Sequence, residues 1–150
     1  MDTADLDAQR LPNALWSTAG RLRTMAYDLF LEHQPAITWR QFAMYGATPG
    51  MQVLGVTLDL RDGREMTCGL TVRMSPEAFS VEADIGVDDP ENAENAEDDE
   101  NSGYRYLLEI PEAPADSLDG CLRLIDHRVA QLIDAAPRLL RELRAGTSKG

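Results

Sequence analysis

The sequence contains little cysteine: Cys68 and Cys121 are the only two among 150 residues. Two cysteines this far apart in the chain are too few for a disulfide framework or a zinc site. Both fall on the apolar faces of the elements predicted below, which indicates that they are small buried hydrophobic residues. We therefore expect a fold that needs neither a disulfide nor a metal ion.

Long apolar runs are absent too. No segment approaches the roughly 20 apolar residues that a helix needs to cross a bilayer. The first residues, 1–5, are acidic and lack the basic and apolar regions of a secretory signal. These absences predict a cytoplasmic protein that does not contact a membrane.

Catalytic motifs are missing as well. The sequence has neither the Gly-x-Ser-x-Gly turn of hydrolases nor a glycine-rich phosphate loop. The two histidines, His33 and His127, have no ligand-type residue at helical spacing on their own faces, so we assign them structural or surface roles. His33 ends a predicted helix, where the helix dipole favours an imidazolium. Glu82 and Asp84 share a strand face, but no substrate-positioning group accompanies them. The sequence thus predicts a protein that is not an enzyme and has no cofactor.

The charge is large and uneven. The net charge of −12 argues against a nucleic-acid partner, whose phosphates would have to be neutralised by basic residues. Residues 88–100 hold eight acidic residues and no basic one, which leaves 18 of the 26 acidic residues against 14 basic ones elsewhere, a net charge of −4. Self-repulsion and the lack of large apolar groups predict a disordered acidic loop over residues 88–102. No glycine lies between Gly86 and Gly103, so the loop lacks the pattern of a calcium site.

Three successive segments alternate strictly between apolar and polar residues: 53–60, 65–74 and 79–87. Asp62-Gly63 between the first two is typical of a tight hairpin turn. A strict period of two over consecutive strands predicts an antiparallel meander with one buried and one wet face.

Two further strands complete the predicted sheet. The aromatic segment 37–45 breaks its alternation, and we interpret it as a first strand with a bulge near Gln41. Residues 104–110 alternate, with Tyr104, Tyr106, Leu108 and Ile110 on the buried face. Pro111 to Pro114 then end the sheet.

Apolar residues at intervals of three and four predict a helix at each end. The first begins at Asn13, after a flexible segment 1–12, and ends before Pro35. The second begins at Asp116 or Ser117 and ends near residue 145, with a kink or restart at Pro137 and a tail over 146–150. The sequence therefore predicts one α+β domain over residues 13–145. Its architecture is a two-layer sandwich, α-β-β-β-β-β-α, with both helices on one face of the sheet.

The wet face of the sheet is the candidate binding surface, although any exposed sheet face carries polar residues. It is predicted to carry Thr57, Asp59, Thr67, Thr71, Arg73, Ser80, Glu82, Asp84, Arg105 and Glu109. Gly55, Gly69 and Gly86 leave its centre flat. We hypothesise that Asp59, Glu82 and Asp84 on the sheet, with Asp98, Asp99 and Glu100 in the acidic loop, bind a basic protein partner.

The order helix, meander, helix, with residues 56–60, Asp62-Gly63, 70–73 and 80–84 before Ser117-Leu118-Asp119 and Leu122, resembles small bacterial immunity proteins of polymorphic toxin systems of the TriTu group. That resemblance implies an acidic inhibitor that blocks the basic active site of a toxin. The layout also resembles type III secretion chaperone-like domains, but these have a helix between the third and fourth strands, which this chain lacks. Either resemblance implies protein binding, to a toxin or a secreted effector.

Two alternatives remain open at this stage. One is a small-molecule carrier or enzyme with a site between sheet and helices, near Trp39, Tyr45 and His127. The other is a homodimer that pairs through sheet edges or open faces and has no further partner.

Overall fold

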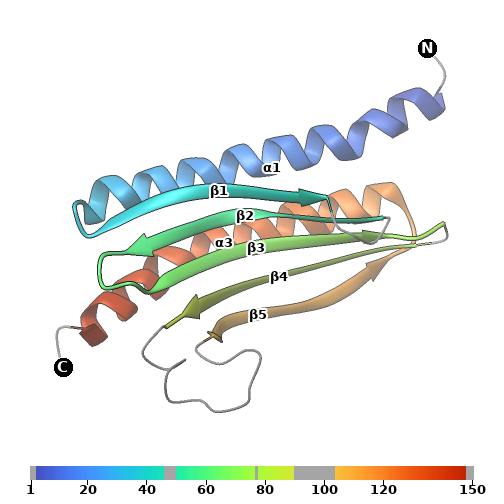
Figure 1. Cartoon of the computed structure of the whole chain (residues 1–150). Coiled ribbons are helices and arrows are strands. Elements are labelled where there is room, and N and C mark those ends of the chain that lie inside the picture. Colours follow the sequence, from blue (N-terminus) through green and yellow to red (C-terminus); the bar gives the residue numbers. More distant parts are fainter. Residues whose placement is uncertain (1–2, 46–49, 77, 90–103, 148–150) are drawn as a thin grey trace.

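A computed structural model describes residues 3–45, 50–76, 78–89 and 104–147. The chain runs as a helix, five strands and a second helix. The bounds of these elements are α1 Thr3–His33, β1 Ile37–Tyr45, β2 Met51–Leu60, β3 Glu65–Met74, β4 Phe79–Asp88, β5 Tyr104–Ala115 and α3 Leu118–Thr147. This is the predicted α+β layout (Figure 1).

The five strands form one sheet in the order β1-β2-β3-β4-β5, so every strand pairs with its neighbours in sequence. All the pairings are antiparallel. Between β2 and β3 the chain reverses at Gly63, whose φ of 98° lies in the region that favours glycine. The Arg64 N–H donates to Asp62 Oδ1 at 3.0 Å and fixes this turn. The predicted meander is confirmed.

The alternating apolar side chains of β2, β3 and β4 all point to one side of the sheet. Met66, Cys68 and Leu70 on β3 are completely buried there. A fully buried aliphatic side chain contributes roughly 1.5–3 kcal/mol, so the burial of this layer against the helices favours folding. Both cysteines are buried and free, as predicted, and burial raises the pKa of Cys68 to about 12.

Both helices lie behind the same side of the sheet (Figure 1). Helix α1 contacts β1 and β2, whereas α3 contacts β3, β4 and β5. Three ion pairs between described residues join the helices: Arg10 to Asp119, Arg21 to Asp126 at 2.7 Å and Arg141 to Glu32 at 3.2 Å. No helix among the described residues combines the length and the apolar character that crossing a bilayer requires. The opposite side of the sheet, here called the open face, is covered by no described helix.

Strand β1 differs from the prediction. Its register with β2 is continuous from Ile37 opposite Leu60 to Tyr45 opposite Gln52, so there is no bulge near Gln41. The alternation is kept because Gln41 points to the helix side, where its Nε2 donates to the Ala19 carbonyl of α1 at 2.8 Å. A polar side chain with a hydrogen-bond partner thus takes a position where the pattern predicts an apolar one.

Helix α1 is longer than predicted, whereas α3 agrees closely with its predicted bounds. Helix α1 begins at Thr3 and includes Pro12, instead of starting at Asn13. The buried side chain of Leu11 extends the apolar stripe before this proline. Helix α3 continues past Pro137 to Thr147 because Leu140 and Leu143 hold its last turns against the core.

Strand β5 also runs further, through Pro111 and Pro114 to Ala115. An edge strand tolerates proline because half of its N–H groups face away from the sheet. Two register shifts interrupt its pairing with β4, one of them between Ile85 and Gly86. The extra residue at this shift is Leu107, and it reverses which residues of the first half of β5 face the helices.

Candidate functional site

The open face consists of the alternate residues of each strand that point away from the helices. One row crosses all five strands in register and contains Phe42, Gly55, Gly69, Asp84 and Glu109. Directly opposite residues in antiparallel strands point to the same side, so these five positions are neighbours on one surface. The row changes from aromatic at β1 to small in the middle and acidic at β4 and β5.

Two aromatic rings lie over the glycines of this face. The Phe42 ring lies above Gly55, where an added Cβ would meet the ring at 2.7 Å and the Cys68 carbonyl oxygen at 2.1 Å. The Tyr104 ring lies above Gly86, where a Cβ would meet the phenol oxygen at 2.2 Å. Glycine is required at both positions because any side chain would displace the ring or the neighbouring strand.

Gly69 lies between the two rings and has more room. The nearest atoms to a Cβ at this position are Asp84 Oδ1 at 3.9 Å and the Phe42 ring at 4.0 Å. The surface above Gly69 is therefore bounded by an aromatic ring on one side and a carboxylate on the other. Tyr104 adds a second ring beside Asp84 and contacts Tyr106 edge-on, with the ring centroids 5.3 Å apart.

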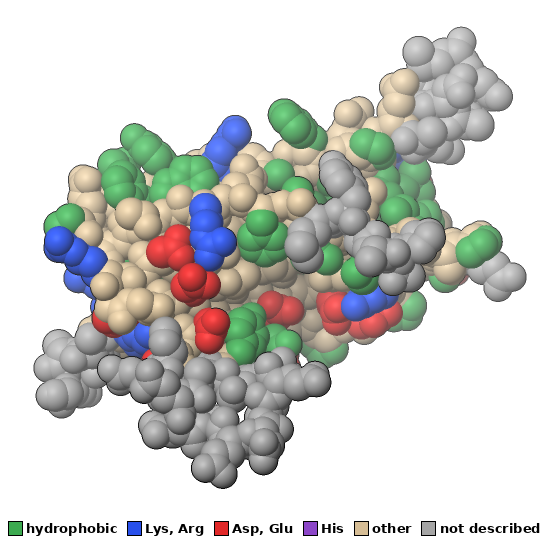
Figure 2. All heavy atoms as spheres, viewed as in Figure 1, with side chains coloured by type: hydrophobic (Ala, Val, Ile, Leu, Met, Phe, Trp, Pro, Cys, Tyr) green, Lys and Arg blue, Asp and Glu red, His purple; other side chains and the backbone are tan. Residues whose placement is uncertain are grey.

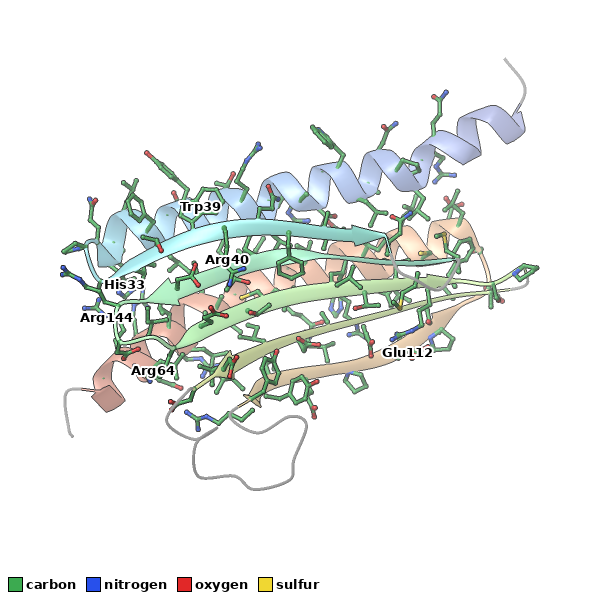
Figure 3. The ribbon with its side chains drawn as sticks, viewed as in Figure 1. His33, Trp39, Arg40, Arg64, Glu112 and Arg144 are labelled. Carbon is green, nitrogen blue, oxygen red and sulfur yellow. The ribbon has the colours of Figure 1, made fainter. Side chains whose placement is uncertain are left out.

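The two arginines of the open face are already neutralised. Arg40 contacts Asp59 and Glu65, each at 3.3 Å. Arg73 contacts Glu82 at 2.7 Å and Glu112 at 3.6 Å. Figure 3 shows Arg40 and Glu112 at opposite ends of this face, and Figure 2 shows acidic side chains spread across its middle with basic ones between them.

Asp84 carries one of the negative charges that these arginines leave uncompensated. It is half-buried and has no hydrogen bond or ion pair with any described residue. Burial, together with the nearby carboxylates of Glu82 and Glu109, raises its pKa above the ordinary value of 3.8. Burial and the charge of Asp84 likewise raise the pKa of Tyr104 to about 12. The site is an environment that favours a proton or a cation at Asp84.

The predicted binding residues, and Arg105 of the predicted wet face, divide into three groups. Asp59, Glu82 and Asp84 are confirmed on the open face, on β2 and β4. Asp98, Asp99 and Glu100 lie outside the described residues. Arg105, predicted on the open face, lies instead opposite Val87 on the helix side, because the register shift at Leu107 reverses the phase of β5.

Sequence reasoning missed both aromatic residues of the site. Phe42 would have been found if the alternation had been continued through Gln41, since Arg40 and Phe42 then share a face. Tyr104 was predicted on the buried face, and the shift at Leu107 brings it to the open one. No pattern in the sequence marks that shift.

Of the residues predicted near the alternative site, Trp39 and His127 lie on elements that are not in extensive contact. Trp39 packs against the core from β1, and Figure 3 shows it directed toward α1. His127 is exposed on α3, which contacts β3, β4 and β5. The side chain of Tyr45 lies outside those that the structure describes.

His33 is a buried polar residue that lies away from the open face. Its Nδ1 lies 2.6 Å from Arg144 Nη1, and both residues appear together at one end of the molecule in Figure 3. Burial lowers the pKa of His33 below 6.5, and Arg144 and Arg141 lower it further while Glu32 opposes them. The expectation of an imidazolium stabilised by the helix dipole is therefore wrong. His33 accepts a hydrogen bond from Arg144 as a neutral ring and joins the two helices.

Among the residues that the structure describes, no group of three or more histidine, cysteine, aspartate or glutamate side chains is placed to hold a metal ion. The open face combines unpaired carboxylates with two aromatic rings on a side of the sheet that no described helix covers. Comparison with known proteins leaves this chain without a match, since no family model, no curated protein and no solved structure is similar to it.

Proposed function

We propose that the open face of the sheet binds a basic segment of a protein partner, and that the protein acts by docking and not by catalysis. The observation that carries this proposal is Asp84: a half-buried carboxylate between other carboxylates, with a raised pKa and no cationic partner among the described residues. A guanidinium or ammonium group placed beside Asp84 and Glu109 would relieve this repulsion. Its binding would be favoured by the same charges that destabilise the unbound face.

The charge of the whole face supports such a partner. Its two arginines are each shared between two carboxylates, and more acidic groups surround them. The carboxylates of the face are Asp59, Glu65, Glu82, Asp84, Asp88, Glu109 and Glu112. A field of one sign attracts an oppositely charged partner over several ångströms and speeds association at low ionic strength.

The aromatic rings beside the carboxylates favour arginine in particular. Phe42 and Tyr104 lie on either side of the Gly69–Asp84 region. A guanidinium can stack on an aromatic face while it donates to a carboxylate, and such contacts contribute about 0.5–2 kcal/mol. The flat surface at Gly69 leaves the approach to Asp84 open.

The biological class that fits this mode of binding is an inhibitor or a chaperone. An acidic surface that covers a basic region can block the active site of a toxin or protect a secreted effector before export. The sequence resemblance to immunity proteins supports the first of these roles, and the one to secretion chaperones the second. In both, the partner is a basic protein.

A matched pair of variants tests the proposal. Asp84→Asn/Glu109→Gln removes two open-face charges that take part in no ion pair with a described residue. Asp28→Asn/Asp134→Asn removes the same number of charges from exposed positions on the helices. Immobilised wild-type protein and both variants are used for affinity capture from cell extract at low and at high salt.

We expect a basic partner that the wild type and the helix variant retain at low salt and that the open-face variant loses. High salt should weaken its capture because the attraction between exposed charges is screened. Capture that is indifferent to salt, or equal for the two variants, would remove the open face as the binding surface.

A further inference from the structure

The two edges of the sheet are unequally protected. β5 carries Pro111 and Pro114 and has two register shifts, features that stop another strand from pairing with an edge. β1 has nine residues, contains no proline and pairs with β2 without a shift. A long, regular edge of this kind is a template for a further strand.

The hydrogen-bonding groups of that edge can be assigned. The Arg61 N–H donates to the Ala36 carbonyl at 3.0 Å, directly before the first pair of the β1–β2 ladder. Because bonded pairs alternate along antiparallel strands, the even-numbered residues of β1 bond to β2. The odd-numbered residues therefore direct their N–H and C=O groups outward. They are Ile37, Trp39, Gln41, Ala43 and Tyr45.

This edge is complementary to itself. If a second β1 pairs antiparallel about Gln41, the bonded pairs are Gln41 with Gln41 and Trp39 with Ala43. The large indole then lies opposite a methyl group, so the layer fills without a clash. On the open face, Arg40 lies opposite the second copy's Phe42, which is a cation–π pair. Both strands contribute the outward N–H and C=O groups that the other requires.

Helix α1 presents apolar residues beside this edge. Trp16 is 82% exposed and Tyr27 is 49% exposed, although both are large hydrophobic side chains. Trp16 and Arg23 line a groove of about 590 Å³ between α1 and the strands β1 and β2, together with Pro12, Ala19, Gln41 and Ala43. Trp16 of α1 and the edge of β1 thus lie on one continuous surface.

The spacing of the layers lets two copies of α1 meet behind such a pair of strands. Helix α1 lies over β1 and β2, and neighbouring strands are about 4.8 Å apart. A two-fold axis just outside β1 then places the two α1 helices about 10 Å apart, which is an ordinary distance for packed helices. They would cross near Ala19, since Gln41 on the axis donates to the Ala19 carbonyl.

The residues at this crossing are suited to close contact. Beyond the backbone of its own helix turn and its chain neighbours, Gly20 has no atom within 4 Å of the position where a Cβ would stand. An antiparallel pairing of the helices about Ala19 and Gly20 brings Trp16 opposite Arg23 of the second copy. Small residues lie at the closest approach, and an aromatic–cation pair lies one turn to either side.

We propose that two copies of this chain associate through β1 and α1, joining their sheets into one continuous antiparallel sheet. The self-complementary edge of β1 selects a second copy as the occupant, and the local charge permits its approach. The net charge of −12 makes most of the surface repel its own kind. The contact surface proposed here, β1 and the groove beside it, contains no carboxylate among its described residues. Its charged groups are Arg23 and Arg40, and Arg40 is neutralised by Asp59 and Glu65. In this dimer Arg40 of the second copy engages Phe42, whereas Asp84 and Glu109 of the open face stay uncovered for a basic partner.

The experiment uses the full chain in sedimentation equilibrium, with Trp16→Glu as the interface variant and Tyr106→Glu as its control. Tyr106 is also an exposed aromatic residue, at 56%, but lies on the open face at β5. Circular dichroism verifies that both variants fold. We expect the wild type and Tyr106→Glu to be dimers and Trp16→Glu to dissociate at least tenfold more readily.

Amide hydrogen exchange then locates the interface. Exchange at Gln41 and Ala43 should be slow in the wild type and at least tenfold faster in Trp16→Glu at the same protein concentration. A monomeric wild type, or a Trp16→Glu variant that dimerises as tightly as the wild type, would overturn the proposal. Dissociation caused by Tyr106→Glu alone would place the contact on the open face and overturn it as well.

Discussion

The two faces of β3 show how one strand serves two purposes. Toward the helices it presents Met66, Cys68, Leu70 and Val72, all completely buried. Toward the open side it presents Thr67, Gly69, Thr71 and Arg73. Of these, Arg73 forms an ion pair with Glu82. The covered face therefore determines whether the chain folds, while the open face is free to carry groups that folding does not require.

This difference predicts where substitutions should matter for stability. A charge on the covered face would be buried without a partner, whereas the same charge on the open face remains accessible to water. Asp84 and Glu109 are therefore compatible with the fold only because no helix covers them. They form the acidic end of the open row, on β4 and β5, where burial of the core does not require them.

The largest expected effect is loss of a covered side chain. Leu70→Ala should reduce the free energy of unfolding by about 2–5 kcal/mol, because it leaves a cavity in a fully buried layer. Thr71→Ala, the next residue on the same strand, should change it by less than about 0.5 kcal/mol. Urea denaturation of both variants measures the difference. Equal losses of unfolding free energy would mean that the two faces of β3 contribute equally to stability.

Gly55 is an expected exception on the open face. Gly55→Ala should cost about 1–3 kcal/mol, since the added methyl group would meet the Phe42 ring and the Cys68 carbonyl. At Gly69 the nearest atom to an added Cβ lies 3.9 Å away, so Gly69→Ala should leave the free energy of unfolding nearly unchanged. Denaturation of this matched pair checks whether Phe42 packs over Gly55. A neutral Gly55→Ala would show that the ring does not lie there.

A smaller effect on the covered side comes from His33. Its pKa is lowered below 6.5 in the folded state, so the unfolded chain binds the proton more readily. Its contribution to stability is therefore present above pH 6.5 and is lost as the pH falls through 6.5 toward the folded pKa. His33→Gln should flatten stability against pH in that window, measured by thermal unfolding. The opposite result would contradict a neutral His33: the wild type would lose stability as the pH rises toward 6.5, and His33→Gln would not.

The smallest expected effect is on the open face, and its sign is opposite. The pKa of Asp84 is raised, so its ionisation disfavours the folded state, and this cost grows as the pH rises through 3.8. Asp84→Asn should therefore stabilise the protein at pH 7, on the order of 0.5 kcal/mol after solvent screening. The gain should vanish below pH 3.8. Destabilisation by this variant at pH 7 would show that Asp84 is required by the fold.

The sequence predicted the centre of the sheet well and its margins poorly. Strict alternation over 65–74 predicted β3 because every second residue must be buried against a helix. At the edges this rule is weaker. Gln41 takes a helix-side position because its amide reaches the Ala19 carbonyl, a partner on another element that no local pattern can indicate.

The candidate site was predicted in part for the same reason. Glu82 and Asp84 belong to a regular central strand, and their face followed from the alternation. Tyr104 belongs to β5, where one extra residue at Leu107 changes the phase. Such a shift depends on the partner strand, so the aromatic half of the site became visible only in three dimensions.

The central claim is that the open face binds cationic side chains at Asp84. The most direct test is a titration of the isotope-labelled protein with a hexa-arginine peptide, followed by amide NMR shifts. We predict shifts at Gly69, Gly86 and neighbouring open-face amides of the wild type and of Asp28→Asn/Asp134→Asn, and their loss in Asp84→Asn/Glu109→Gln. Shifts that are equal in the two double variants, or that fall on α1 and α3 and not on the sheet, would contradict the account.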